Sequence, residues 1–238
     1  MIEKTAAESV PARGRKQGGR MNHRKIAFVS DFDGTITEDD FFSYTADAYF
    51  DEKALAPWRE YRAGRKTHFD ALKEMFAQIH VSEGELHALI DRIRVDPDLD
   101  SVWRLCRDKG ISLYVCSAGN DYYIRRILGD RLKKYDVTLV ANKGAYAPKT
   151  GLVMTAPDRE YPFYDADVGI SKYRLVQKLK DEGRFVLFAG DGPPDFEPAK
   201  AADVVFARKI LLDECRKAGL ETKRFDGFKD IGNYIREL

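Results

Sequence analysis

Short, uninterrupted apolar runs are the feature that most constrains the fold of this chain. Four of them stand out, at residues 26–29, 113–116, 185–188 and 204–207. Runs of this length that are apolar at every position are typical of strands buried on both faces of a sheet. Glycines precede the second and third runs, where a helix would end. The four runs therefore predict the core strands of a sheet.

The segments between these runs have the apolar spacing of amphipathic helices. Apolar residues recur three and four positions apart in 99–106, 123–128 and 173–179. Strands that alternate with helices predict an α/β fold with a doubly wound parallel sheet. Residues 142–170 are rich in Gly, Pro, Tyr and Asp, and there we predict only one short strand, at 151–154.

Residues 37–96 break this alternation. Apolar positions follow helical spacing twice in succession, at 69–79 and 86–93, with no strand pattern between them. An insertion placed directly after the first strand lies over the carboxyl end of the sheet, where such sheets bind ligands. We therefore predict a helical cap over 37–96 that acts as a lid, on an α/β core formed by 25–36 and 97–238.

The first 24 residues differ from the rest of the chain. Arg and Lys cluster there beside glycines, with few large apolar side chains to bury. We expect a disordered extension. A nucleic-acid-binding arm is one interpretation, but a dispensable extension, or a start upstream of a true start at Met21, fits better because runs of charge are usually solvated. We assign this segment no function.

The composition limits the partners and the compartment. Lys and Arg total 40 against 39 Asp and Glu, so we expect no nucleic-acid and no membrane partner. No apolar run approaches the roughly 20 residues that span a bilayer, and no apolar segment near the N-terminus could serve as a signal peptide. The three cysteines are far apart among apolar residues, as free thiols would be. The sequence thus predicts a cytoplasmic protein.

Two aspartates directly follow the first predicted strand. Asp31 and Asp33 flank Phe32 and precede Gly34, which permits a tight turn. Paired carboxylates at the end of a strand suit Mg²⁺, because this hard cation prefers oxygen ligands. They can also divide the work of hydrolysis, since one can attack phosphorus while the other donates and then removes a proton. An isolated Asp-Gly pair is more often an ordinary turn.

The longer string at 31–37, Asp-Phe-Asp-Gly-Thr-Ile-Thr, resembles the first motif of the haloacid dehalogenase superfamily. Three further motifs of that superfamily follow in order. The second is a Ser or Thr that ends the next core strand, and Ser117 matches it. Its hydroxyl and the amides of Ala118 and Gly119, expected at a helix start, can bind phosphate oxygens. Taken alone, Ser117 would more often be a helix cap.

The third motif is a Lys near a helix start, and Lys172 is the match. A cation there would neutralise the transferring phosphoryl group and hold the nucleophile against charge repulsion. Three other lysines, Lys143, Lys149 and Lys178, compete for this role, and the family spacing favours Lys172.

The fourth motif is acidic and follows a later strand, where Asp191 is the match. The resemblance implies that Asp31 is the nucleophile and Asp33 the acid and base. It also implies that Mg²⁺ is held by the carboxylates of Asp31 and Asp191 and by the main-chain carbonyl of Asp33. Asp195 would then be a further metal-side or supporting carboxylate. Relatives that act as dehalogenases lack the second carboxylate, so Asp33 favours phosphoryl transfer.

The insertion between the first two motifs is similar to the cap of phosphoserine-phosphatase-like members, which encloses small substrates. Residues 203–228 are similar to methionine-salvage phosphatases that act on 2-hydroxy-3-keto-5-methylthiopentenyl 1-phosphate. The Cys-rich stretch of those enzymes is absent from residues 156–169. The resemblance therefore implies a small phosphorylated metabolite as substrate, and phosphoserine or another small phosphomonoester stays open beside the methionine-salvage compound.

Residues of the predicted cap are candidates for substrate contacts. Asp40 falls where phosphoserine phosphatases carry an acid that meets the substrate's amine, and Arg65 lies in a basic stretch. Side chains of both types are more often solvated surface. His68, His80 and His87 lack the spacing of metal ligands, and we assign them no role.

Two interpretations in which the protein does not turn over a substrate stay open. One is a phospho-acceptor or binding module in which Asp31 is phosphorylated as a signal, although such a module needs neither Asp33 nor a lid. The other is a non-catalytic relative, against which the four intact motifs argue. We expect a monomer or a homodimer.

Overall fold

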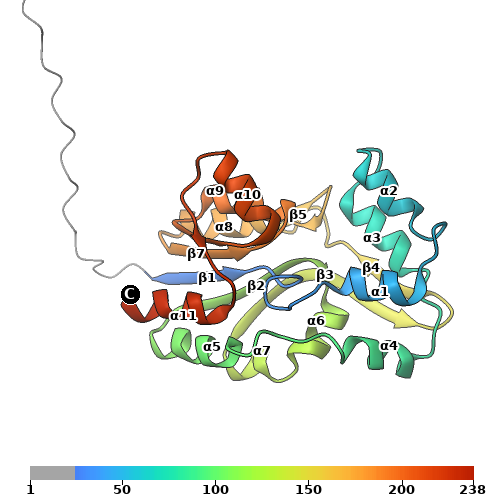
Figure 1. The fold of residues 1–238 in the computed structure, drawn as a ribbon, viewed down its shortest axis with the longest axis horizontal. Helices are drawn as coiled ribbons and strands as arrows, with labels where there is room; N and C mark the ends of the chain where they lie inside the picture. Colours follow the sequence, from blue (N-terminus) through green and yellow to red (C-terminus); the bar gives the residue numbers. More distant parts are fainter. Residues whose placement is uncertain (1–24) are drawn as a thin grey trace, which may run out of the picture.

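A seven-stranded sheet forms the centre of the protein in the computed structural model, which describes residues 25–238 (Figure 1). Its strands follow the order β4-β3-β2-β1-β7-β8-β9, and all neighbours are parallel except β3 and β4. The strands are β1 Ile26–Ser30, β2 Ser112–Asn120, β3 Val137–Ala147, β4 Gly151–Thr155, β7 Phe185–Gly190, β8 Val204–Ala207 and β9 Lys223–Arg224. A separate antiparallel pair is formed by β5 Tyr164–Asp165 and β6 Gly169–Ile170.

Helices cover both faces of the sheet (Figure 1). On one face lie α8 Lys172–Asp181, α9 Phe196–Ala201 and α10 Lys209–Lys217, after the short 3₁₀ turn η1 Pro193–Asp195. On the other lie α5 Leu99–Asp108, α6 Asp121–Leu128, α7 Arg131–Lys134 and α11 Phe228–Glu237. Neighbouring residues of β1 enter different cores, because Phe28 packs with α5 and α11 whereas Ala27 and Val29 pack with α8 and α10. The predicted α/β fold with a doubly wound sheet is confirmed.

The four apolar runs are the buried parts of β1, β2, β7 and β8, and the three helical patterns are α5, α6 and α8. The predicted short strand at 151–154 is β4. Cys106, Cys116 and Cys215 are buried free thiols, as expected. None of the helices within residues 25–238 is long and apolar enough to cross a membrane.

One strand of the sheet, β3, was not predicted from the sequence. Its middle alternates between buried and half-buried positions, and its second half, which alternates between exposed and half-buried positions, leaves the parallel sheet to pair with β4. Strands that are exposed on one side lack a continuous apolar run, which explains why the pattern was weak. Residues 142–170 thus contain the end of β3, all of β4 and the β5–β6 pair.

The segment between β1 and α5 consists of four helices. They are α1 Phe41–Tyr49, α2 Ala56–Arg62, α3 His68–Phe76 and α4 Glu83–Ile90. The core supports α3 from two sides. A methyl group added at Gly151 of β4 would come within 2.2 Å of the Ala77 carbonyl, and the Phe69 amide donates to the Asp167 carbonyl at 2.8 Å. The division into core and cap stays a prediction, and the first 24 residues lie outside the described part of the chain.

Candidate active site

Asp31 stands at the carboxyl end of β1, the central strand. Its amide donates to the Ala189 carbonyl of β7 at 2.9 Å, and its side chain is 5% exposed. The turn that follows brings Gly34 against Asp191, where an added methyl group would lie 2.3 Å from Asp191 Oδ2. Gly34 also has φ +73°, a conformation that other residues rarely adopt. The first motif thus needs glycine both for its turn and for space.

A buried lysine holds two of the carboxylates. Lys172 is the first residue of α8, and its Nζ lies 2.7 Å from Asp31 Oδ1 and 2.5 Å from Asp195 Oδ1. Burial alone would lower the pKa of Lys172, but Asp195 and Asp31 raise it above the ordinary value, so the cation is retained. Lys143 and Lys178 instead pair with Asp121 and Glu182.

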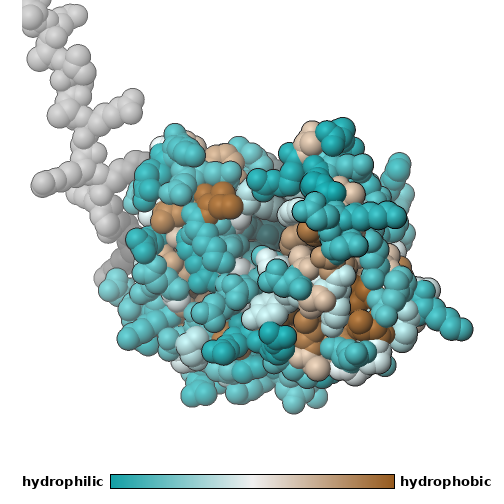
Figure 2. Space-filling model, turned by 45° about the vertical axis from the view of Figure 1, so that its right-hand side comes forward, coloured by the Kyte–Doolittle hydropathy of each residue, from teal (hydrophilic) through white to brown (hydrophobic). Residues whose placement is uncertain are grey.

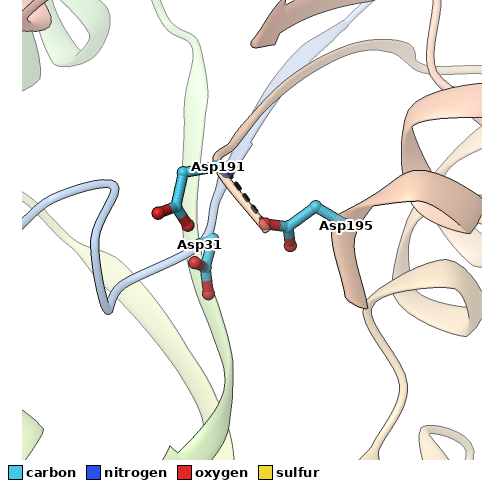
Figure 3. Close-up of side chains that lie close together, drawn as sticks. All are labelled: Asp31, Asp191 and Asp195. Atoms are coloured by element: carbon cyan, nitrogen blue, oxygen red, sulfur yellow. Dashed lines mark hydrogen bonds between the residues drawn. The ribbon is translucent and has the colours of Figure 1, made fainter. Parts of the chain in front are cut away.

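Three carboxylates from two segments meet at this edge of the sheet. Oxygens of Asp31, Asp191 and Asp195 all lie within 4.8 Å of one another, and Figure 3 shows Asp31 and Asp191 side by side just after the ends of the adjacent strands β1 and β7. Burial and the neighbouring Asp195 raise the pKa values of both Asp31 and Asp191. A cation would relieve this repulsion, so the donor set fits a hard, oxygen-binding metal ion.

Asp195 differs from the other two carboxylates because both of its oxygens are occupied. Oδ2 accepts hydrogen bonds from the amides of Asp191 and Gly192 at 2.9 and 3.0 Å, and Oδ1 binds Lys172. The bond to Asp191 is the dashed line of Figure 3. These contacts suit a carboxylate that supports the site and leave Asp31 and Asp191 to offer oxygens to a metal.

Asp33 points to a different set of neighbours. Its Oδ1 accepts from the Phe41 amide at 3.0 Å, and its Oδ2 accepts from the Tyr123 hydroxyl at 2.6 Å and from Ser117 Oγ at 3.4 Å. Burial raises the pKa of Asp33 to about 6, although the bonds from Tyr123 and Phe41 oppose the shift. A carboxyl with this pKa can both donate and accept a proton near neutral pH.

The segment of the second motif lies at a bulge in β2 and not at a helix start. The register between β2 and β3 shifts between Ser117 and Asn120, and Asn120 is the residue that caps α6. Ser117 Oγ accepts from the Gly119 amide at 2.9 Å. The expectation of free amides at a helix start is therefore wrong, because α6 begins only at Asp121. Ala118 and Gly119 nevertheless line the same pocket as the carboxylates.

Three residues that the sequence did not single out hold the loops of the first, second and fourth motifs in place. Asn142 Nδ2 donates to the Ala118 carbonyl at 2.8 Å, which fixes the peptide of the second motif. Lys209 Nζ lies 3.2 Å from Asp191 Oδ2. Arg208 donates to the carbonyls of Gly34, Thr35 and Thr37 and stacks on Phe225. No local sequence pattern identifies these three residues, because each of them contacts residues that are far from it in the sequence.

A pocket of about 290 Å³ lies above the carboxylates. Its floor includes Asp31, Asp33, Lys172 and Asp191, and its other side comes from the helical segment: Asp40, Phe42, Trp58, Arg62, His68, Leu72 and Phe76. Figure 2 shows a hollow between two lobes of the surface, with hydrophobic surface beside it. Of the two candidate substrate contacts, Asp40 lines the pocket and Arg65 does not.

His68 lies in this pocket wall, although its sequence context gave it no role. Its Nδ1 is buried and has no hydrogen-bond partner among residues 25–238. The ring packs edge-on against Trp58 and Tyr61, at centroid distances of 5.9 and 5.1 Å. Burial, with a smaller effect of the charge on Lys172, lowers the pKa of His68 to about 4. The imidazole is therefore neutral at physiological pH.

This low pKa predicts a pH dependence of stability. Unfolded His68 would bind a proton near its ordinary pKa of about 6.5, whereas the folded form resists protonation until about pH 4. The free energy of unfolding should therefore fall as the pH drops through this window. We expect His68→Phe to remove roughly 2–3 kcal/mol of this loss, measured by urea denaturation at a series of pH values.

His80→Gln is the matched control, because it also removes an imidazole, but from an exposed position. Parallel stability curves for wild type and His68→Phe would contradict the assignment of a neutral, buried imidazole.

Comparisons with known proteins agree with this geometry. The model of the family described as haloacid dehalogenase-like hydrolase matches residues 27–203. A 2-hydroxy-3-keto-5-methylthiopentenyl-1-phosphate phosphatase of Exiguobacterium sibiricum is 25% identical over 89% of this chain and 96% of its own length. The Pdp3-interacting factor 1 of Schizosaccharomyces pombe is 26% identical over 92% and 98%. A substrate-bound phosphoserine phosphatase structure superposes with a TM-score of 0.65 at 18% identity, over 90% of this chain and 99% of that one.

Proposed function

The chain belongs to the haloacid dehalogenase-like hydrolases and is a phosphatase of that family, and from this premise we propose that it hydrolyses a small phosphomonoester with Mg²⁺ through an aspartyl-phosphate on Asp31. The observation that carries the proposal is the placement of Asp31. It is buried, paired with Lys172 and open to the same pocket as Asp33 and Asp191.

The two aspartates of the first motif divide the reaction. A carboxylate oxygen of Asp31 attacks phosphorus, and the bond from phosphorus to the leaving oxygen breaks while Asp33 gives that oxygen its proton. Water then attacks the phosphorus of the aspartyl-phosphate, and Asp33 takes the proton back as inorganic phosphate leaves. The bonds from Phe41 and Tyr123 hold Asp33 away from Asp31 and ready for both steps.

The remaining residues bind the phosphoryl group. Lys172 offsets its negative charge beside Asp31. Ser117 Oγ and the amides of Ala118 and Gly119 line the pocket and can donate to phosphoryl oxygens, once Gly119 exchanges its present bond to Ser117. The second and third motifs thus supply the donors that the transferring group needs.

The carboxylates of Asp31 and Asp191 and the main-chain carbonyl of Asp33 would hold Mg²⁺, with Asp195 as the supporting carboxylate. Bound there, the ion would neutralise charge on the phosphoryl oxygens and bring the substrate against the nucleophile. The side-chain oxygens of Asp33 are engaged elsewhere, which leaves its carbonyl as the group to offer.

The helices at 37–96 would form the cap, over a core of 25–36 and 97–238, and would enclose the substrate against bulk water. Small substrates follow from the size of the pocket. The candidates are the compound named for the Exiguobacterium relative and phosphoserine, which is named for the superposed phosphoserine phosphatase. A monomer or homodimer in the cytoplasm remains our proposal for the form that acts.

Mg²⁺-dependent phosphate release tests the proposal. We expect release from at least one member of a panel of phosphoserine, sugar phosphates and the methionine-salvage compound, a fall to background in excess EDTA, and recovery with excess Mg²⁺. Asp191→Asn should raise the Mg²⁺ concentration that gives half-maximal activity, because it removes a charged ligand.

Asp213→Asn provides the control, since this exposed carboxylate of α10 pairs with Arg216 on the same helix. Full activity in excess EDTA would refute the metal assignment. A folded protein that takes up phosphate on Asp31 without releasing it would favour a phospho-acceptor instead.

A further inference from the structure

We propose that the cap side of the pocket selects phosphomonoesters whose body is apolar and uncharged, with Trp58 and His68 as the residues that set this specificity. The inference rests on the proposed phosphatase function and goes beyond it, because it names the class of leaving group. It follows from the side chains that the helical segment presents to the pocket.

The wall opposite the carboxylates is predominantly aromatic and aliphatic. Phe42 and Trp58 pack with their rings tilted by 31° and the centroids 4.4 Å apart, and the Trp58 ring centroid lies 5.0 Å from that of Tyr61. Leu72 and Phe76, both buried, continue the wall toward the core. Such a surface gains by covering apolar groups of a ligand and costs free energy when it strips water from a charge.

His68 adds hydrogen-bonding capacity without charge. Its ring lies against Trp58 and Tyr61, and its Nδ1 is a buried polar atom without a partner in the described chain. Because the pKa is lowered, the ring presents one donor and one acceptor nitrogen. A carbonyl or hydroxyl on the substrate suits such a group better than an ammonium or carboxylate does.

The charged residues that the helical segment brings to the pocket are one acid already used as a helix cap and one exposed base. Asp40 caps α1, where Oδ1 accepts from the Ser43 amide at 2.5 Å and Oδ2 from Ser43 Oγ at 3.1 Å. A substrate ammonium would have to share both oxygens of this acid with the helix cap. Arg62 lines the pocket but is exposed to solvent, so it does not make the wall basic.

Three substrates with the same reacting group separate the alternatives. Butyl phosphate has an apolar body, phosphoserine a zwitterionic one and phosphoglycolate an anionic one. We expect kcat/KM to be at least about tenfold higher for butyl phosphate than for either charged ester. Methyl phosphate, whose body is too short to reach the wall, reports on the chemistry alone.

Two variants locate the preference. Trp58→Ala should lower kcat/KM about tenfold more for butyl phosphate than for methyl phosphate. His68→Phe keeps an aromatic ring but loses the nitrogens, so it should lower kcat/KM for 2-oxobutyl phosphate and spare butyl phosphate. Tyr44→Ala is the matched control, because Tyr44 belongs to α1 and is not among the pocket residues.

The outcomes distinguish this inference from the proposed function. Asp31-dependent release that favours phosphoserine or phosphoglycolate would overturn the inference and keep the phosphatase. An equal loss for butyl and methyl phosphate in Trp58→Ala would also overturn it, because the residue would then act on fold or chemistry. No release from any of the five esters, nor from the sugar phosphates and the methionine-salvage compound, by folded wild-type protein with Mg²⁺ would remove the proposed function and the inference with it.

Discussion

Replacing Asp31 with asparagine should abolish phosphate release while the protein keeps its fold. Asparagine has nearly the same shape, but it lacks the anionic oxygen that attacks phosphorus. We expect turnover to fall by about 10⁴-fold or more, the scale on which the loss of a nucleophile acts in enzymes with covalent intermediates. Lys172 would keep its ion pair with Asp195, so the thermal midpoint should change little.

Quantitative phosphate release and thermal unfolding of the two proteins measure this. Asp39→Asn is the matched control, because Asp39 lies in the same stretch of chain but is exposed, and it should behave as wild type. After quenching, labelled phosphate should be recovered on wild type and not on Asp31→Asn. Turnover by Asp31→Asn at the wild-type rate would show that another group attacks phosphorus.

Lys172→Met should cost both activity and stability. The substitution removes the cation that separates Asp31 from Asp195 and leaves three carboxylates whose oxygens lie within 4.8 Å of one another. Breaking a buried ion pair by removing one partner typically costs about 3–5 kcal/mol. We expect a loss of this size in EDTA, and a partial recovery with Mg²⁺, because an ion bound only by the folded state stabilises it.

Urea denaturation with EDTA and with Mg²⁺ separates these contributions. Lys178→Met is the control on the same helix, since Lys178 is exposed, pairs with Glu182 and should contribute at most about 1 kcal/mol. Activity should stay low in Lys172→Met even where Mg²⁺ restores stability, because the phosphoryl group loses its cation. Wild-type stability of Lys172→Met in EDTA would show that the carboxylates do not depend on Lys172.

The sheet and the carboxylates of the site could be predicted from the sequence because local sequence patterns identify both. A strand buried on both faces is apolar over most of its length, as β1 is at 26–29 and β7 at 185–189, and Asp31 and Asp191 follow directly on those two strands. Their meeting then follows from strand pairing, since β1 and β7 are parallel neighbours. The ordered motifs made the same residues recognisable by resemblance.

The site residues that could not be predicted from the sequence depend on contacts between segments that are far apart in the chain. Tyr123 has the spacing of a core helix residue, and only the fold brings its hydroxyl to Asp33. His68 begins a helix between Thr67 and Phe69, a context that does not mark a pocket residue, yet its ring packs against Trp58 and Tyr61. Arg62 and Arg65 lie three residues apart in the same basic stretch, and only the fold shows that Arg62 lines the pocket and Arg65 does not.

The hydrogen bonds from Arg208 to carbonyls of the first motif limit how far the chain can be shortened. All four motifs lie between residues 31 and 195, and the family match ends at 203. A fragment cut at that point would contain every catalytic side chain but would release the carbonyls of Gly34 and Thr37. It would also lose Phe225, on which Arg208 stacks. The smallest autonomous catalytic unit is therefore larger than the stretch that defines the family.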